Sequence, residues 1–255
     1  MAGSWRKLAF SLFAAALWPA AAHALVLTSE EVEAGAARLY QERIEAARQR
    51  FELDADPVFL ARVTRIASRL IGQSEREQGG AGRMIWEVHT TADPEENASC
   101  MAGGKLLIGH DYARRLELND AELAMLIAHE MEHALLRHNL KEMREALRLE
   151  PERARLSYAD LEYAVDHDEP LMRKLDSLDA EQEFEADRAG LLLAVRAGWS
   201  GAALANYFRK LVRHDPQANF DRSEHPAPAR RWRAAQELVK QLNPIEAEQA
   251  AATLK

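Results

Sequence analysis

The 255-residue chain contains a single cysteine, Cys100, and has fewer basic than acidic side chains. One cysteine cannot form an internal disulfide or, alone, a cysteine-based zinc site, so disulfide scaffolds and zinc fingers are excluded. With 33 Lys and Arg against 41 Asp and Glu, the chain lacks the basic surface that binding to nucleic-acid phosphates requires. A metal ion would therefore have to be held by histidines and carboxylates.

Long apolar runs are also absent after residue 24, so the mature chain is predicted to have no membrane span. Residues 1–24 hold Arg6 and Lys7, an apolar run that is too short to span a bilayer, and the small-x-small pattern Ala22-His23-Ala24. This arrangement is typical of a cleaved secretory signal. Together with the unpaired cysteine, it predicts a periplasmic protein of a Gram-negative envelope.

The remaining sequence predicts one α+β domain, mostly helical, over residues 25–245, followed by a tail over residues 246–255. Amphipathic helices are expected at residues 28–50 and 56–72, because apolar residues recur there at helical spacing after capping residues. Short runs of β-forming residues predict strands at 84–88 and 105–108. From Asn119 onward the pattern is helical, with breaks near proline and glycine residues.

The helix that follows Asn119 is the one that carries candidate chemistry. Residues 123–128 are apolar on every side, so this helix should be buried. The polar residues that follow, His129-Glu130-Met131-Glu132-His133, would be costly to bury without partners. His129 and His133 are four residues apart and lie on one helix face, which is the His-Glu-x-x-His metal pattern.

A catalytic zinc ion takes three protein ligands, so a third must come from elsewhere. The chain has Leu136 and Asn139 where a metzincin requires glycine and histidine, so that class is excluded. His138 is five residues after His133 and, on a continuous helix, would point away as a solvated or capping residue. The better candidates lie in an acidic segment over residues 179–190, which we expect to open another helix.

Glu183 and Asp187 in that segment are four residues apart on one face, and Gly190 on the same side would allow close helix packing. One carboxylate could bind the ion while the other accepts a hydrogen bond from a ligating imidazole. Glu185 is better explained as part of a solvated face. Glu181 also fits that face, but these residues by themselves leave it open as the ligand.

The two segments together resemble the gluzincin metallopeptidase family that includes the CAAX-prenyl endopeptidases, the heat-shock membrane proteases and periplasmic quality-control proteases. The resemblance implies a zincin-type domain with a small sheet beside the active-site helix, and one zinc ion per chain. It makes His129, His133 and Glu183 the zinc ligands, Asp187 their hydrogen-bonding partner, and Glu130 the general base.

Two weaker matches extend the resemblance. Residues 97–104 are similar to the family's segment that leads into the strand beside the cleft, with Ala102 in place of a proline. His225-Pro226, with Arg231 six residues after the histidine, is similar to a late family motif, which implies that His225 lies near the metal. His225 would then stabilise the oxyanion or occupy the open coordination site.

An extended substrate could add as a strand beside residues 105–108. The predicted substrate-binding residues are Asn97, Gly103, Gly104, Lys105, Leu106 and Leu107.

The predicted function is zinc-dependent cleavage of unfolded or misassembled envelope proteins, with polypeptides as partners. Two alternatives remain open at this stage, a chaperone-like binding module that does not cut and a zinc amidase acting on cell-wall peptides. The charged span over residues 139–178 is either a solvated helical hairpin or a lid over the cleft.

Overall fold

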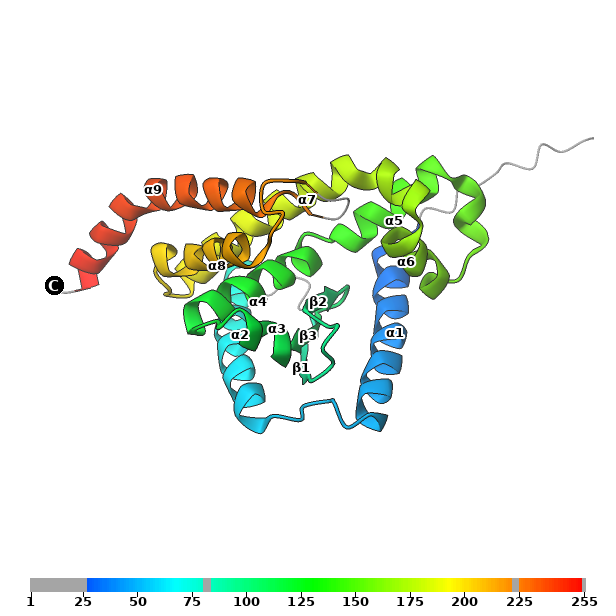
Figure 1. The fold of residues 1–255 in the computed structure, drawn as a ribbon, viewed down its shortest axis with the longest axis horizontal. Coiled ribbons are helices and arrows are strands. Elements are labelled where there is room, and N and C mark those ends of the chain that lie inside the picture. Colours follow the sequence, from blue (N-terminus) through cyan, green and yellow to red (C-terminus); the bar gives the residue numbers. More distant parts are fainter. Residues whose placement is uncertain (1–26, 80–83, 222–224, 254–255) are drawn as a thin grey trace, which may run out of the picture.

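The structure, a computed structural model, describes residues 27–79, 84–221 and 225–253 (Figure 1). The predicted signal over residues 1–24 lies outside these ranges. The fold is α+β and mostly helical, as predicted. The helices are α1 (Ser29–Gln49), α2 (Pro57–Glu77), α3 (His110–Arg115), α4 (Asp120–Leu135), α5 (His138–Leu149), α6 (Tyr158–His167), α7 (Glu169–Arg196), α8 (Gly201–His214) and α9 (Pro228–Thr253), with a 3-10 turn at Pro151–Arg155.

The first two helices begin where their capping residues predict. Thr28 and Glu31 form a complete capping box at α1, and the Asp56 side chain accepts hydrogen bonds from two backbone amides at the start of α2. α2 continues five residues beyond Gly72, which was expected to end it. A glycine inside a helix costs only about 1 kcal/mol relative to alanine, and the buried apolar face of α2 outweighs that cost.

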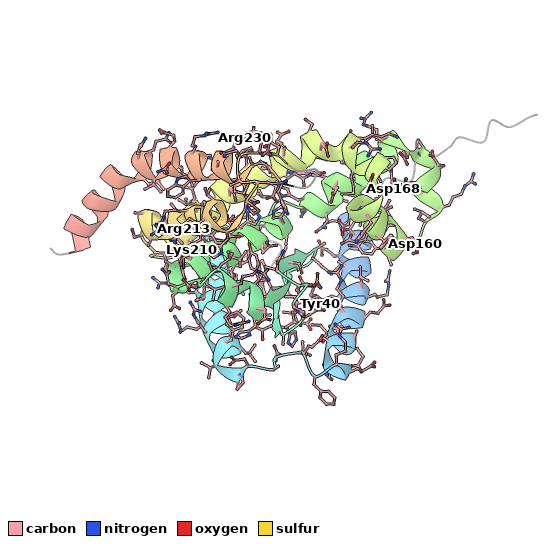
Figure 2. The ribbon with its side chains drawn as sticks, viewed as in Figure 1. Tyr40, Asp160, Asp168, Lys210, Arg213 and Arg230 are labelled. Atoms are coloured by element: carbon pink, nitrogen blue, oxygen red, sulfur yellow. The ribbon has the colours of Figure 1, made fainter. Side chains whose placement is uncertain are left out.

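A small sheet lies between α1 and α2 (Figure 1). Its strands are β1 (Glu87–Thr91), β2 (Ala98–Met101) and β3 (Lys105–Gly109), in the order β1-β3-β2. β3 pairs parallel to β1 and antiparallel to β2. β1 begins three residues later than predicted. Tyr40 of α1, labelled in Figure 2, donates from its hydroxyl to the Leu106 carbonyl oxygen at 2.7 Å and so ties α1 to the central strand.

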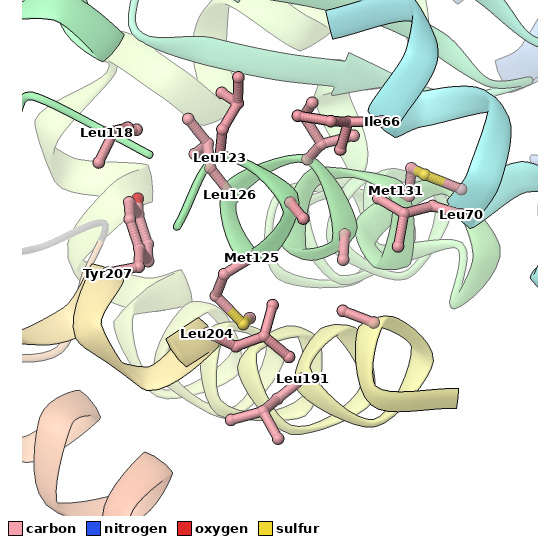
Figure 3. Close-up of a cluster of buried hydrophobic side chains, with 14 of the residues drawn as sticks. Ile66, Leu70, Leu118, Leu123, Met125, Leu126, Met131, Leu191, Leu204 and Tyr207 are labelled. Carbon is pink, nitrogen blue, oxygen red and sulfur yellow. The ribbon is translucent and has the colours of Figure 1, made fainter. Parts of the chain in front are cut away.

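α4 forms the centre of the core, as its apolar composition predicts. Its capping box at Asn119 and Glu122 is complete. Residues 123–128 are at most 2% exposed and pack against α2, α7 and α8. Figure 3 shows Leu123, Met125 and Leu126 of α4 within this cluster. Burial of each such side chain contributes about 1.5–3 kcal/mol, which fixes α4 and therefore the residues at its C-terminal end.

The span over residues 139–178 folds into α5, the 3-10 turn, α6 and the first turns of α7. It has its own buried apolar cluster, which consists of Leu140, Met143, Ala146, Leu161, Ala164, Val165, Leu171 and Leu175 with Val32 of α1. It is therefore a packed helical unit at one end of the molecule, where Figure 2 labels Asp160 and Asp168.

α7 begins at Glu169, ten residues earlier than expected. The Asp168 side chain caps it and Pro170 occupies its first turn, where the missing amide hydrogen costs nothing. The acidic segment over residues 179–190 therefore lies in the middle of a 28-residue helix and not at a helix N-terminus.

α8 packs on α4, and α9 packs on α8 and α7 (Figure 1). Lys210 of α8, labelled in Figure 2, forms an ion pair with the buried Glu122 at 2.8 Å, which joins α8 to the first turn of α4. Residues 246–253 of the predicted tail continue α9. Within the described ranges, none of the helices combines the length and the apolar character needed to cross a bilayer.

Candidate metal centre

The structure brings together the three predicted ligands. His129 and His133 of α4 face Glu183 of α7. The two histidine Nε2 atoms are 3.2 Å apart, and Glu183 Oε1 lies 3.2 Å from Nε2 of His133 and 3.6 Å from Nε2 of His129. Ligand atoms around a tetrahedral zinc ion, at about 2.0–2.1 Å from it, are roughly 3.3 Å apart. The donor set and its spacing therefore fit zinc.

Close packing of α7 on α4 makes this arrangement possible. Gly190 of α7 lies so near α4 that a β-carbon at that position would be 2.8 Å from the His129 backbone nitrogen. The sequence-based expectation of close approach at Gly190 is therefore confirmed. Because α7 turns once every 3.6 residues, Glu183 and Asp187 lie on this same face, within reach of the histidines.

Asp187 and Arg231 form a buried layer behind the ligands. Asp187 Oδ1 is 2.9 Å from Nδ1 of His129, and the Arg231 guanidinium donates two hydrogen bonds to Asp187, at 2.6 and 2.7 Å. Arg231 also lies 2.9 Å from Glu183 Oε2. A carboxylate on the second nitrogen of a ligating imidazole fixes its tautomer and ring orientation. Arg231 in turn holds both carboxylates in place.

The charged groups around the two histidines stabilise a cation between them. Burial lowers the pKa of His129, but the Glu183 and Asp187 carboxylates outweigh burial and raise its pKa to about 10. Burial raises the pKa of Glu183, yet Arg231 and His129 hold it well below its usual value. The carboxylates are therefore ionised and stabilise a positive charge at this position, whether a proton or a metal ion.

His138 is buried beside His133, contrary to the prediction from the sequence. It is 2% exposed, its Nδ1 is 3.1 Å from Nδ1 of His133, and its Nε2 is 3.2 Å from Glu185. The prediction of a solvated or capping residue was wrong because the helix does not continue. Arg137 adopts a left-handed conformation with φ of 57°, which ends α4 and starts α5 in a new direction.

The contact between His138 and His133 completes a second hydrogen-bonding chain behind the ligands. His133 is oriented by His138, and His138 by Glu185, which also lies 3.3 Å from Lys141. Glu185 therefore contacts His138 and also belongs to the exposed helix face. Each ligating imidazole thus has its own partner, Asp187 for His129 and His138 for His133.

Glu130 and His225 lie at the open side of the three ligand atoms. Glu130 is half-buried, and burial raises the pKa of its carboxyl group above the usual value. His225 is exposed and its Nδ1 is 3.1 Å from Glu183 Oε2, so the late motif does lie beside the centre. Glu181 is exposed and is not part of the group of three ligands.

A cleft crosses the metal centre and extends from it in two directions. One cavity of about 540 Å³ extends toward α5, α6 and α7, and another of about 420 Å³ extends toward α3, α8 and the start of α9. The residues that line both are Asn97, Ala98, His129, Glu130 and His225. An extended polypeptide could therefore run across the ligand atoms from one cavity to the other.

The predicted position of an added substrate strand was wrong. β3 is the central strand and both of its edges are paired, so no substrate can add beside residues 105–108. Leu106 and Leu107 are core residues, at most 4% exposed. Gly103 and Gly104 form the β2–β3 turn with φ near 80°, where they and Lys105 lie away from the cleft.

The strand whose edge faces the cleft is β2. Among the described residues it pairs with β3 alone, and all four of its residues line the larger cavity. Asn97, which precedes β2, is the predicted substrate-binding residue that does line the cleft. The signal that favours β2 is its place after a turn-rich loop, but four residues were too few to identify a strand from sequence.

A buried His-Glu-x-x-His helix with a carboxylate from a second helix defines a metal-dependent hydrolase site. A model of peptidase family M48 matches residues 60–239, and the chain belongs to that family. The sequence-based assignment to a family of zinc metallopeptidases is therefore confirmed.

Curated relatives agree with this assignment. The mitochondrial metalloendopeptidase OMA1 of Arabidopsis thaliana is 29% identical over 162 residues, 63% of this chain and 32% of that protein. The beta-barrel assembly-enhancing proteases of Yersinia pestis and Escherichia coli K12 are 24% and 26% identical over 203 and 165 residues. The matched regions cover 74% and 59% of this chain and 40% and 34% of the two relatives, respectively. The chain thus spans about a third to two fifths of the length of these relatives.

Proposed function

We propose that this protein is a zinc-dependent endopeptidase that cleaves unfolded or misassembled proteins of the bacterial envelope. The observation that carries the proposal is the spacing of the ligand atoms of His129, His133 and Glu183, 3.2 to 3.6 Å apart, with Glu130 beside them. A zinc ion at this position would polarise a water molecule and the substrate carbonyl.

The side chains around the ligands would then perform the proton transfers. Glu130 would take a proton from the attacking water and return it to the leaving amine. Burial raises its pKa, which makes the carboxylate a stronger base. His225, exposed beside Glu183, would stabilise the developing oxyanion or cover the open site in a resting state.

The substrate would bind as an extended chain along β2. Among the described residues β2 pairs with β3 alone, so its other edge could receive an extended chain, and backbone pairing selects such chains with little dependence on side chains. Folded proteins do not present such segments, so unfolded chains would be preferred. The name of the beta-barrel assembly-enhancing proteases supports an envelope role.

Digestion of casein by the purified mature protein tests the activity. We expect cleavage with one zinc ion per chain, loss of cleavage on chelation, recovery when zinc is added back, and loss of cleavage in Glu130→Gln. Zinc-loaded protein that binds casein without cutting it would favour the binding module. Cleavage of cell-wall peptides but not casein would favour the amidase.

The periplasmic location is tested by the N-terminus of the exported protein. If residues 1–24 are a cleaved signal, sequencing of the mature chain should begin at Leu25. A chain that keeps residues 1–24 would contradict the signal.

A further inference from the structure

The larger cavity extends beyond the metal centre to a region walled by α5, α6 and α7. The cavity lining is acidic, with Glu142, Glu162, Asp166 and Asp179 on these helices and Glu95 and Glu96 before β2. Arg43, which is exposed, is the one lysine or arginine among the described residues that line it. An acidic lining alone is not evidence for a ligand. Buried polar atoms in the same lining are independent evidence for one.

Besides the ligand Glu183, three lining residues hold buried side-chain atoms that have no hydrogen-bond partner within the described part of the chain. They are Glu162 Oε2, Gln182 Nε2 and Asn139 Oδ1. Glu162 and Gln182 are only 7% and 5% exposed. Burying a polar atom without a partner is costly, and such groups in binding sites are typically satisfied by the ligand.

Glu162 is the most informative of the three. Burial and the neighbouring Asp166 raise the pKa of its carboxyl group to about 7, although the Tyr158 hydroxyl and Arg43 lower it. The net shift is upward, so Arg43 does not offset the cost of burial, and the charged carboxylate would be stabilised by a further cation. A positive group brought into the cavity would supply one.

We infer that this part of the cleft is a specificity pocket that binds an arginine or lysine side chain of the polypeptide substrate. Glu162 Oε2 would accept a charge-assisted hydrogen bond from the guanidinium or ammonium group, and Asn139 Oδ1 would accept a second. Gln182 Nε2 is a donor and would instead bind a carbonyl oxygen of the substrate. The inference rests on the proposed function, because the pocket opens onto the metal centre.

A second metal ion is a less suitable occupant. Within the described residues, His129, His133 and Glu183 are the group that brings three ligand atoms close enough to hold an ion, and Glu162 belongs to no such group. A cationic side chain needs one or two acceptors and carries its charge on a long apolar stem. The pocket therefore suits a substrate residue close to the cleaved bond.

The test compares peptides that differ at one position flanking the cleaved bond, with arginine, lysine, leucine or citrulline. Citrulline has the shape of arginine without its charge. In the wild-type enzyme we expect kcat/KM for the arginine or lysine peptide to exceed that for citrulline by about tenfold or more, as one charge-assisted hydrogen bond would give. In Glu162→Gln the preference should fall to within about threefold.

Glu169→Gln is the matched control, because Glu169 is an exposed acid on α7 outside the cavity, and its substitution should keep the preference. Equal kcat/KM for all peptides in the wild type would overturn the inference and leave the peptidase intact. A preference that survives in Glu162→Gln would overturn the assignment to Glu162.

A binding measurement separates failure of the inference from failure of the proposed function. Fluorescence anisotropy of the same peptides with zinc-loaded Glu130→Gln protein reports binding without cleavage. If the wild type cleaves no peptide, the proposed function fails, while tighter binding of arginine than of citrulline would still support the pocket. Equal binding of both peptides would overturn it.

Discussion

Replacing Arg231 by methionine tests whether the buried layer behind the metal ligands stabilises the protein. Arg231 is 6% exposed and lies within 2.6 to 2.9 Å of oxygen atoms of both Asp187 and Glu183. Methionine fills much of the same volume but leaves two buried carboxylates without their shared cation.

The expected cost follows from this geometry. Removing one partner of a buried ion pair typically destabilises a protein by about 3–5 kcal/mol, because the remaining charge stays buried. In a domain of this size, 1 kcal/mol corresponds to a change in Tm of about 2–4 °C, so Arg231→Met should lower Tm by roughly 6–20 °C. The loss should be largest in chelated protein, since a bound metal ion would compensate for part of the missing positive charge.

Arg230→Met is a suitable control, because Arg230 is the neighbouring residue on α9 and forms an exposed ion pair with Asp221. Such pairs contribute about 0–1 kcal/mol. Thermal unfolding of both variants, with chelator and with excess zinc, gives the comparison. Equal shifts in Tm for the two variants, or a shift for Arg231→Met that zinc does not reduce, would refute this account of the layer.

Other predictions concern the ligands and the packing around them. Glu183→Gln should lower the zinc content of the purified protein, whereas Glu181→Gln should not; the reverse result in metal analysis would move the ligand by two positions. His138→Ala should weaken zinc binding by about 10–100-fold in competition with a chromophoric chelator, whereas a purely structural role would lower Tm and leave the zinc affinity unchanged. Gly190→Ala should destabilise the protein by about 1–3 kcal/mol in denaturant unfolding because its β-carbon meets the α4 backbone, while Gly72→Ala, whose β-carbon would make only an ordinary contact with the Arg76 side chain, should stabilise it slightly.

Much of the centre could be predicted because its signals are local in the sequence. The spacing of His129 and His133 fixes them on one helix face, and the apolar run before them predicts that the helix is buried. The spacing of Glu183 and Asp187 predicts a shared face in the same way. For the third ligand this local signal was not enough, and the family resemblance was needed to favour Glu183 over Glu181.

The errors arose where one backbone conformation or a non-local pairing decided the outcome. The left-handed conformation of Arg137 redirects the chain after α4 and brings His138 behind His133. Periodicity assumes a continuous helix and cannot detect such a change. Likewise, a run of β-forming residues predicts a strand but not its neighbours, so the paired edges of β3 were not foreseeable.

The sequence by itself determined the helical character of the chain, the buried helix with its two histidines, and the residue types that suit zinc, because each depends on contacts within a few positions. Only the tertiary structure decided that Arg231 joins Asp187 to Glu183. It likewise decided that β2 borders the cleft and that Glu162 is buried in the cleft wall. These features depend on segments that are distant in the chain, and packing of the common core brings them together.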